Sequence, residues 1–370
     1  MSQIAVPKWD IKPEDAVKIL QNPQNHGHVE VCEALHVLDT EEIFTKISPP
    51  GLHVTLPKQK ALKRITTEIL LRSPLVFKPT TKRVDHTVAI NKDTGEIYQI
   101  YPQHTRDGFT DLRAFEGAMS YQHGGKEVKI PHVALVGYDG FVNERLSSGM
   151  KSIAVTSKLQ TSVAEFVVAA QKQEDLEALK DQKVIIVAKS YAEIFKDWLQ
   201  KTYPEASPVI REVEGGSEGR VAVTPGANLV VDITDSGKSL LENGFEFVLP
   251  ISRAAPVLVR HVNLEEQFEQ AVADRVEDLS QVLREASQKA FPNAQVFEPS
   301  RVIAEQERQI SRIQDEGITS EIQTIPDFLK SAGKNGERDK PSEQKSSCQS
   351  PEGYEFPYGV KPGWQQRLAA

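Results

Sequence analysis

The sequence predicts an α/β protein with enough chain for two domains, and two observations support this prediction. Short apolar runs alternate with amphipathic segments between residues 52 and 261, which is typical of a parallel or mixed sheet covered by helices. The chain has 370 residues, of which 39% are hydrophobic and 26% are charged, as in globular proteins that bury a sizeable core.

Residues 1–50 are expected to form a helical extension. The segments 12–15 and 39–42 carry the proline and acidic residues that are favoured in the first turn of a helix. Pro49-Pro50-Gly51 then interrupts regular structure.

The region that follows is expected to hold the sheet. Apolar or alternating runs predict strands at 52–56, 84–90, 96–101, 133–136, 152–156, 183–188, 227–233, 247–251 and 256–261. Amphipathic patterns predict helices at 61–71, 112–118, 163–171 and 191–203. Apart from the helix at 112–118, the polar residues 102–131 are expected to form a long loop, and loops of this size are often functional.

The C-terminal part is expected to be helical over 263–330, followed by a disordered tail, 331–370, with an aromatic terminus. One apolar stripe repeats at three- and four-residue spacing: Leu264, Phe268, Val272, Val276, Leu279 and Leu283. Such a stripe indicates a docking face or a contact between subunits, so self-association is one reading of it.

Charge and composition exclude several functions. The net charge of −8 argues against binding of nucleic acid or of an anionic membrane surface. No apolar run is long enough to span a bilayer, and the N-terminus lacks the pattern of a secretion signal. With two distant cysteines, Cys32 and Cys348, a cytoplasmic protein without disulfides is expected.

The segment 231–244 has the order of an anion-binding site, because a buried strand leads through a hydroxyl-rich turn into a helix. Backbone N–H groups at a helix start point outward, and Gly237 would let a ligand approach the backbone closely. The turn also offers hydroxyl groups from Thr234, Ser236 and Ser239. Asp232 and Asp235 would instead suit a ribose diol or Mg²⁺. The alternative is an ordinary capped strand-to-helix turn.

This segment resembles the phosphoribosyl-pyrophosphate loop of ATP phosphoribosyltransferase, the enzyme that opens histidine biosynthesis. The matching positions are Asp232, Ser236, Gly237, Ser239, Leu240 and Asn243. Further blocks match in the same order: Leu56-Pro57-Lys58, Thr81-Lys82-Arg83, Ala134 to Asp139, Val187 to Tyr191, Gly216 to Glu218, and Pro225 to Asn228. Gln59-Lys60 and Gly219-Arg220 depart from the family pattern, and its Arg-x-x-Asp-Ile-Pro element is absent. The part that would bind ATP is therefore matched less well than the phosphoribosyl part.

The resemblance implies two α/β lobes like those of type II periplasmic binding proteins. Residues 51–262 would form this core, with lobe I at about 51–150 and 246–262 and lobe II at about 151–245. Substrates would bind between the lobes: phosphoribosyl pyrophosphate and an acceptor, with ATP as the first choice.

The resemblance also implies roles for individual residues. The 5-phosphate would be held by the turn of Thr234, Asp235, Ser236, Gly237, Lys238 and Ser239. Asp232 would bind the ribose hydroxyls or help hold Mg²⁺, and Asp139 would orient the acceptor. Pyrophosphate or the nucleotide would be neutralised by basic residues: Lys58, Lys82, Arg83 and Lys189. Three alternatives stay open: a relative with another acceptor or sugar phosphate, a non-catalytic protein that binds a small anion, and a regulatory subunit.

Overall fold

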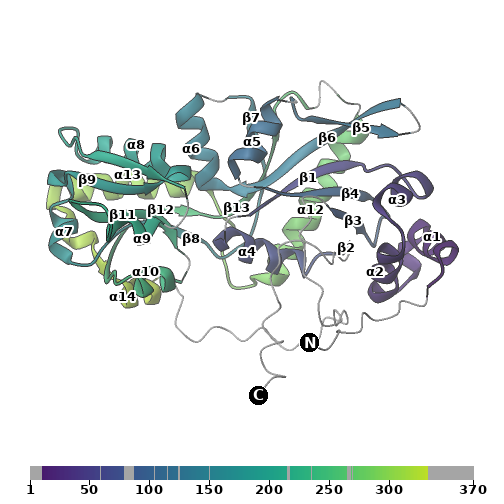
Figure 1. Ribbon diagram of the computed structural model, residues 1–370, viewed down its shortest axis with the longest axis horizontal. Helices are drawn as coiled ribbons and strands as arrows, with labels where there is room; N and C mark the ends of the chain where they lie inside the picture. The colour runs from purple at the N-terminus through teal and green to yellow at the C-terminus, as the bar shows by residue number, and fades with distance from the viewer. Residues whose placement is uncertain are drawn as a thin grey trace, which may run out of the picture.

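Two mixed β-sheets with helices on their faces form two lobes that lie side by side (Figure 1). The computed structural model describes residues 11–331 except 59, 79–86, 104, 115, 124–125, 150, 215–216, 235, 265–267 and 269. The predicted α/β class and the two-lobed arrangement are confirmed. The tail predicted for 331–370 lies, apart from residue 331, outside the described residues.

Lobe I contains the larger sheet, with the strand order β2-β3-β4-β1-β6-β13-β7 and with β5 paired to β6. Its strands are β1 (Leu52–Pro57), β2 (Leu75–Phe77), β3 (Thr87–Asn91), β4 (Ile97–Gln103), β5 (Ala118–His123), β6 (Lys126–Gly137), β7 (Ile153–Lys158) and β13 (Pro256–His261). Strand β1 is parallel to β4 and β6. The C-terminal ends of β1 and β6 therefore lie at the same edge of the sheet.

Lobe II contains the sheet β10-β9-β11-β8-β12-β14. Its strands are β8 (Ala164–Ala170), β9 (Val184–Ala188), β10 (Val209–Val213), β11 (Ala227–Thr234), β12 (Phe247–Ala254) and β14 (Gln323–Thr324). Strands β9, β10 and β11 are parallel to one another, so their C-terminal ends also lie at one edge.

Helices cover both lobes. Those of lobe I and its N-terminal extension are α1 (Pro13–Gln21), η1 (Pro23–Asn25), α2 (His28–Val37), α3 (Thr40–Lys46), α4 (Lys60–Leu70), α5 (Thr105–Ala114), α6 (Tyr138–Ser148) and α12 (Gln270–Ala290). Those of lobe II are α7 (Gln173–Glu177), η2 (Leu179–Asp181), η3 (Lys189–Tyr191), α8 (Ala192–Thr202), α9 (Ser217–Val221), α10 (Lys238–Glu242), α13 (Pro299–Glu316), η4 (Ile318–Glu321) and α14 (Ile325–Ser331). No described helix is both long and apolar enough to span a membrane.

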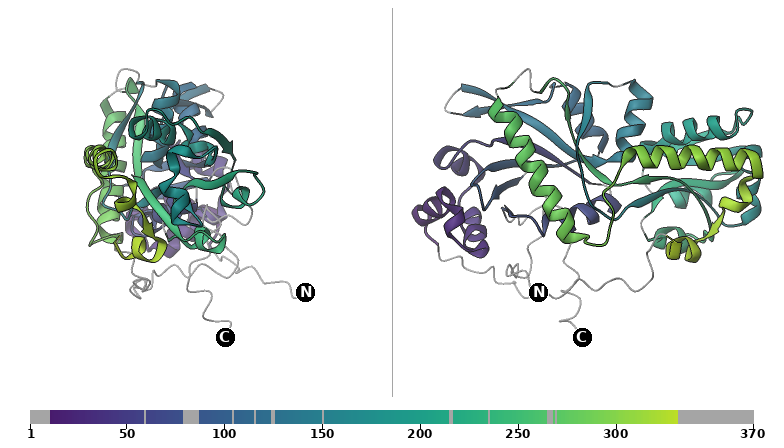
Figure 2. Two further views of the ribbon diagram at one scale, coloured as in Figure 1. Left: turned by 90° about the vertical axis from the view of Figure 1, so that its left-hand side faces the viewer. Right: turned by 180° about the vertical axis from the view of Figure 1, so that it is seen from behind.

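The lobe boundaries differ from the predicted ones. Strand β7 pairs with β13 and therefore belongs to lobe I, although 151–245 was assigned to lobe II. Strand β12 pairs with β8 and belongs to lobe II, although 246–262 was assigned to lobe I. The chain crosses between the lobes after β7 and after β12, and crosses a third time between α12 on lobe I and α13 on lobe II (Figure 2).

The helix predicted at 163–171 is wrong, because this segment forms β8. The strand lies between β11 and β12, and all of its side chains are buried. Phe166 and Val168 enter one core of lobe II, whereas Val167 and Ala169 enter the core on the other face of the sheet. A strand that is buried on both faces has no polar-apolar alternation, so its sequence cannot be told from that of a buried helix.

The long loop predicted for 102–131 is also wrong. The segment holds the end of β4, helix α5, strand β5 and the first half of β6. Strands β5 and β6 form an antiparallel pair from Ala118↔Pro131 to His123↔Lys126. Its polar residues belong to an arm that extends beyond the sheet, where both faces of a strand can carry polar side chains.

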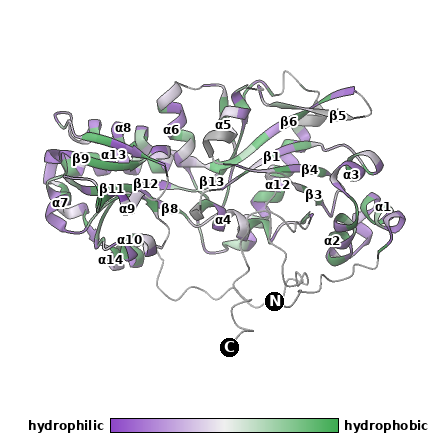
Figure 3. Cartoon of the chain, in the orientation of Figure 1, coloured by the Kyte–Doolittle hydropathy of each residue, from purple (hydrophilic) through white to green (hydrophobic). Residues whose placement is uncertain are grey.

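The apolar stripe of the C-terminal segment docks on the protein's own lobe I. Leu264, Val276, Leu279 and Leu283 are buried in the core that also contains strands β1 and β4. The helical region is interrupted between α12 and α13, near Pro292. Burial against lobe I accounts for the described part of the stripe without a second subunit. Figure 3 shows that hydrophobic residues are also concentrated on the strands of both sheets.

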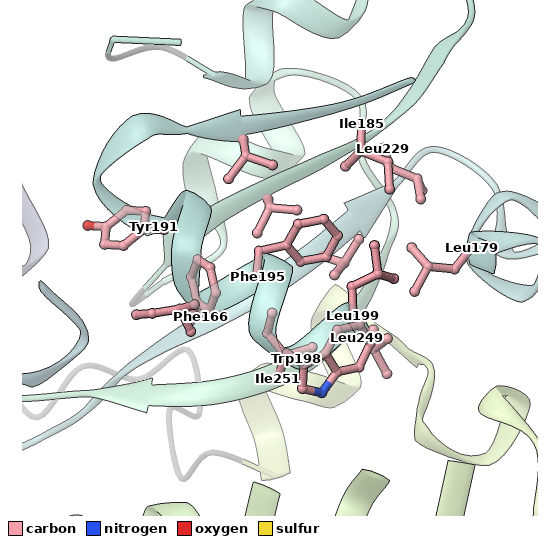
Figure 4. Close-up of a cluster of buried hydrophobic side chains, with 14 of the residues drawn as sticks. Phe166, Leu179, Ile185, Tyr191, Phe195, Trp198, Leu199, Leu229, Leu249 and Ile251 are labelled. Carbon is pink, nitrogen blue, oxygen red and sulfur yellow. The ribbon is translucent and has the colours of Figure 1, made fainter. Parts of the chain in front are cut away.

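The largest side chains in the core of lobe II include two aromatic residues of α8. Phe195 and Trp198 are fully buried among residues of β8, β9 and β11 (Figure 4). Tyr191, at the end of η3, belongs to the same core, and its ring centroid lies 5.2 Å from that of Phe166. Packing of η3 and α8 therefore fixes the position of Tyr191 at the edge where β9 ends.

The N-terminal extension packs on the outer edge of the lobe I sheet. Helices α1, α2 and α3 share one apolar core with Val76, Val88 and Ile97. Lys78 joins the two parts, because its ammonium group donates to backbone carbonyls at the C-terminal end of α2: Leu35 at 2.6 Å, Leu38, and His36 at 3.5 Å. A cation is favoured at a helix C-terminus.

Replacing Lys78 with Met should therefore loosen the extension. The loss of charged hydrogen bonds to carbonyls that stay buried is expected to cost about 1–3 kcal/mol in the free energy of unfolding. Limited proteolysis within residues 12–48 should become faster. Lys46→Met is the matched control, because Lys46 forms an exposed pair with Glu42 that is worth less than about 1 kcal/mol. Equal rates of proteolysis in the Lys78 and Lys46 variants would show that Lys78 does not anchor the extension.

Candidate functional site

The ends of parallel strands bring most candidate residues to one edge of each sheet. Lys58 follows β1, and Asp139 lies two residues after β6, in the first turn of α6. In lobe II, Lys189 follows β9, and Asp232 lies near the end of β11. This edge is where α/β proteins generally bind ligands. Three predicted site residues lie outside the described part of the chain: Lys82, Arg83 and Asp235.

Asp139 is a buried carboxylate. Its side chain is 3% exposed, and its Oδ1 atom has no hydrogen-bond partner among the described residues. Burial raises the pKa of Asp139 to about 6, against the opposite effect of the Gly140 and Asp139 backbone N–H groups and the Tyr191 hydroxyl. This carboxyl group can therefore gain or lose a proton close to neutral pH.

Asp232, in lobe II, is a half-buried carboxylate. The hydroxyl of Ser217 donates to Oδ2, and the backbone N–H of Ile233 donates to Oδ1 at 2.7 Å. Burial raises the pKa of Asp232 to about 6; the bond from Ser217 counteracts this rise, and the carboxylate of Glu218 adds to it. Each lobe thus contributes one carboxyl group that titrates near neutral pH.

Tyr191 interacts electrostatically with both carboxyl groups. Its side chain is 4% exposed. Burial raises the pKa of its hydroxyl well above the ordinary value, and the charges of Asp139 and then of Asp232 raise it further. The hydroxyl therefore stays protonated, so it can donate a hydrogen bond, as it does to Asp139.

The lobes also contact each other directly through α6 and α8. The Oδ1 atom of Asn143 accepts hydrogen bonds from the backbone N–H groups of Glu193 at 2.9 Å and Ile194 at 3.3 Å. These donors belong to the first turn of α8, where N–H groups lack partners within the helix. Val142, next to Asn143, packs against the cores of both lobes.

The turn after β11 has the predicted strand-turn-helix order. Gly237 adopts φ +62°, a conformation that favours glycine, and its N–H donates to the Thr234 hydroxyl at 2.9 Å. The Ser239 hydroxyl donates to Glu218 at 2.7 Å. Thr234 and Ser239 therefore already have partners within the chain, and the Ser239 bond would have to be exchanged for Ser239 to donate to a phosphate.

The predicted basic site residues that the structure describes lie at the surface. Lys189 pairs with Glu214 at 3.2 Å, and Lys238 lies 3.6 Å from Glu242. Lys58 is exposed, and its backbone N–H donates to the Gln103 carbonyl at 2.8 Å. An anionic ligand would have to compete with Glu214 and Glu242 for two of these ammonium groups.

The described residues contain no group of three or more His, Cys, Asp or Glu side chains that could hold a metal ion. Asp232 offers a single carboxylate, paired with the Ser217 hydroxyl. One carboxylate fits a Mg²⁺ ion that keeps water and substrate phosphates as its other ligands. Asp232 is thus suited to a magnesium ion that arrives with a diphosphate.

Tyr191, Ser217, Glu218 and Asn143 were not assigned roles from the sequence. Tyr191 and Ser217 lie within matched blocks and follow predicted or actual strands, which is the one signal that could have selected them. Glu218 lies in the same matched block as Ser217. Asn143 carries no such signal, since its role depends on a contact between elements distant in the chain.

Comparison with known proteins gives one family. Residues 128–285 match the family model of ATP phosphoribosyltransferase. No curated protein sequence matches the chain. The match to the family model includes Asp139, Lys189, Asp232 and the turn that follows Asp232, but it does not include Lys58.

Solved structures give more distant likenesses. One is an ATP phosphoribosyl transferase (HisG:HisZ) complex from Thermotoga maritima, with a TM-score of 0.41, 16% identity, and coverage of 63% of this chain and 99% of that chain. Another is the periplasmic aliphatic sulphonate binding protein SsuA from Escherichia coli, with a TM-score of 0.39, 9% identity, and coverage of 74% and 92%. Likenesses this distant carry no information about activity. The resemblance expected from the motifs is confirmed over residues 128–285, which match the model of the ATP phosphoribosyltransferase family.

Proposed function

We propose that the protein is a cytoplasmic phosphoribosyltransferase that uses phosphoribosyl pyrophosphate as donor and ATP as acceptor. One observation carries the proposal: the family match spans Asp139 of lobe I and Asp232 of lobe II. The site thereby combines residues from both lobes, as a substrate bound between them would require.

In the proposed reaction, the N1 atom of ATP attacks C1 of the ribose. The bond from C1 to the pyrophosphate oxygen breaks, and pyrophosphate leaves with the bonding electrons. Positive charge builds on the sugar and negative charge on the leaving group, so catalysis depends on positioning and electrostatic stabilisation. Asp232 would bind the ribose hydroxyls and stabilise the positive sugar while its carboxyl group is ionised.

The other residues would act on the two ends of the substrates. The turn from Thr234 to Ser239 would hold the 5-phosphate through its backbone N–H and hydroxyl groups. Lys58 and Lys189, with Lys82 and Arg83, would neutralise pyrophosphate, and Asp139 would orient the acceptor. Bound to pyrophosphate and to Asp232, Mg²⁺ would supply further neutralisation of the leaving group.

A second candidate is a two-lobed protein that binds a small anion without chemistry. The bond of Ser239 to Glu218 and the pair of Lys189 with Glu214 do not separate it from the first candidate, because either anion would have to replace these partners. A relative with another acceptor is the third candidate, since the family match begins at residue 128 and does not include the N-terminal half of lobe I.

Incubation of the full chain with Mg²⁺, ATP and phosphoribosyl pyrophosphate, read by mass spectrometry in the presence of pyrophosphatase, tests the proposal. Phosphoribosyl-ATP is the expected product. Binding of phosphoribosyl pyrophosphate without a product would replace ATP by another acceptor, to be sought among nitrogen heterocycles. Absence of binding to either substrate would overturn the proposal.

A further inference from the structure

We propose that Ile325, in the C-terminal helix α14, is a positioning residue that fixes the backbone of the turn between Thr234 and Ser239. The family match ends at residue 285, so this control would come from a part of the chain outside that match. The part of the inference that concerns ligand binding rests on the proposed phosphate-binding role of the turn.

The contact is made at Gly237, the residue of the turn with positive φ. A Cβ atom added to Gly237 would lie 2.6 Å from Cγ2 of Ile325 and 3.7 Å from Cδ1 of Leu329. Real Cβ atoms do not approach other carbon atoms to 2.6 Å, so the Ile325 methyl group fits against the bare backbone of Gly237. Cγ2 is attached directly to Cβ of Ile325, and a β-branched side chain is stiff at χ1. The methyl group can therefore limit movement of the Gly237 backbone toward α14.

Helix α14 is itself held firmly. Ile325 is fully buried and Phe328 is 2% exposed, and both pack with Leu240 and Phe245, which follow the turn. The backbone N–H of Ile325 donates to the Glu246 carbonyl at 2.9 Å. Strand β14, directly before α14, pairs with Phe247 and Val248 of β12. Ile325 is thus attached to the lobe II sheet, which also contains β11, the strand that leads into the turn.

This arrangement determines where the turn's donors point. Gly237 donates to the Thr234 hydroxyl, and the N–H of Leu241 donates to the Gly237 carbonyl at 2.9 Å. A shift of Gly237 toward the space left by Cγ2 would lengthen the first of these bonds and rotate the peptide groups that would face a phosphate. Small misplacements of binding groups reduce binding and catalysis strongly.

Two substitutions separate positioning from simple packing. Ile325→Leu keeps the number of carbon atoms but removes the β-branched methyl group, whereas Ile325→Val keeps Cγ2 and removes a methylene group elsewhere. In the full chain, amide hydrogen exchange of the segment 234–241 is expected to rise in the Leu variant and to stay at the wild-type level in the Val variant. The dissociation constant for Mg²⁺-phosphoribosyl pyrophosphate is expected to rise roughly tenfold in the Leu variant and to stay within about twofold in the Val variant.

The outcomes are distinct. Unchanged exchange in the Leu variant, or an equal rise in the Leu and Val variants, would overturn the positioning role. Faster exchange in the Leu variant only, with a wild-type protein that does not bind phosphoribosyl pyrophosphate, would keep the positioning role and reject the proposed function of the turn. Gly237→Ala adds an independent measurement: it should perturb exchange less when Ile325 is also replaced by Ala, because the methyl group that meets the new Cβ atom is then gone.

Discussion

Replacing Asp232 with Asn is expected to lower kcat by about 10²–10³-fold with little change in the fold. Asn keeps the size of the side chain, and its Oδ1 can still accept the bond from the Ile233 N–H. Its NH₂ group takes the place of Oδ2 and would donate to the Ser217 hydroxyl, which now donates to that oxygen. It removes the negative charge that would stabilise the positive sugar in the transition state. A loss confined to kcat would place the effect on the chemical step, since binding of the ground state needs the charge less.

Wild type and the Asp232→Asn variant can also be compared in the pH dependence of their activity. Because the pKa of Asp232 is raised to about 6, activity of the wild type should increase with pH through this value as the carboxylate becomes charged. The Asn variant should lose this contribution to the pH profile of kcat/KM. Asp315→Asn, at an exposed position on α13, is the matched control and should leave both kcat and the profile unchanged. Full turnover by the Asp232 variant would remove Asp232 from the catalytic machinery, and a change in affinity alone would favour the non-catalytic binding protein.

The sequence contained the alternation of apolar runs and amphipathic segments, and this alternation predicted the α/β class. It did not reveal β8, because Ala164–Ala170 is buried on both faces and has no period of two. It also misplaced β7 and β12 between the lobes, since strand pairing is a non-local property that adjacent residues do not encode.

The candidate site could likewise be predicted from the sequence only in part. Asp139 and Asp232 could be selected because each lies at the end of an apolar run within a matched block. Three other features depend on contacts across the fold: the bond of Tyr191 to Asp139, the bond of Ser217 to Asp232, and the contact of Ile325 with Gly237. The pairing of Lys189 with Glu214 is likewise a surface contact that the spacing of residues does not indicate.

Replacing Asp139 with Asn is expected to stabilise the protein at pH 8, although the family match includes this residue. The pKa of Asp139 is about 6 in the folded protein, above its ordinary value of 3.8, so the folded state binds the proton more tightly than the unfolded state does. The stability that this proton contributes is complete below pH 3.8 and is lost as pH rises through 6. Above pH 6 the ionised, buried carboxylate costs roughly 3 kcal/mol relative to the acid form.

Asn cannot ionise, so the variant should avoid this cost at pH 8 and gain about 2–3 kcal/mol in the free energy of unfolding over wild type. At pH 4.5 the difference should be within about 1 kcal/mol, because Asp139 is then protonated in the folded wild type. Denaturant unfolding at pH 4.5, 6 and 8, with Asp315→Asn as the surface control, measures both values. Destabilisation of the Asp139 variant by the same amount at every pH would show that its hydrogen bonds, from Tyr191 and the backbone, outweigh the cost of the buried charge. A gain in stability accompanied by a loss of phosphoribosyl transfer would show instead that this carboxylate is kept for chemistry at the expense of the fold, as is expected for a functional group buried between two lobes.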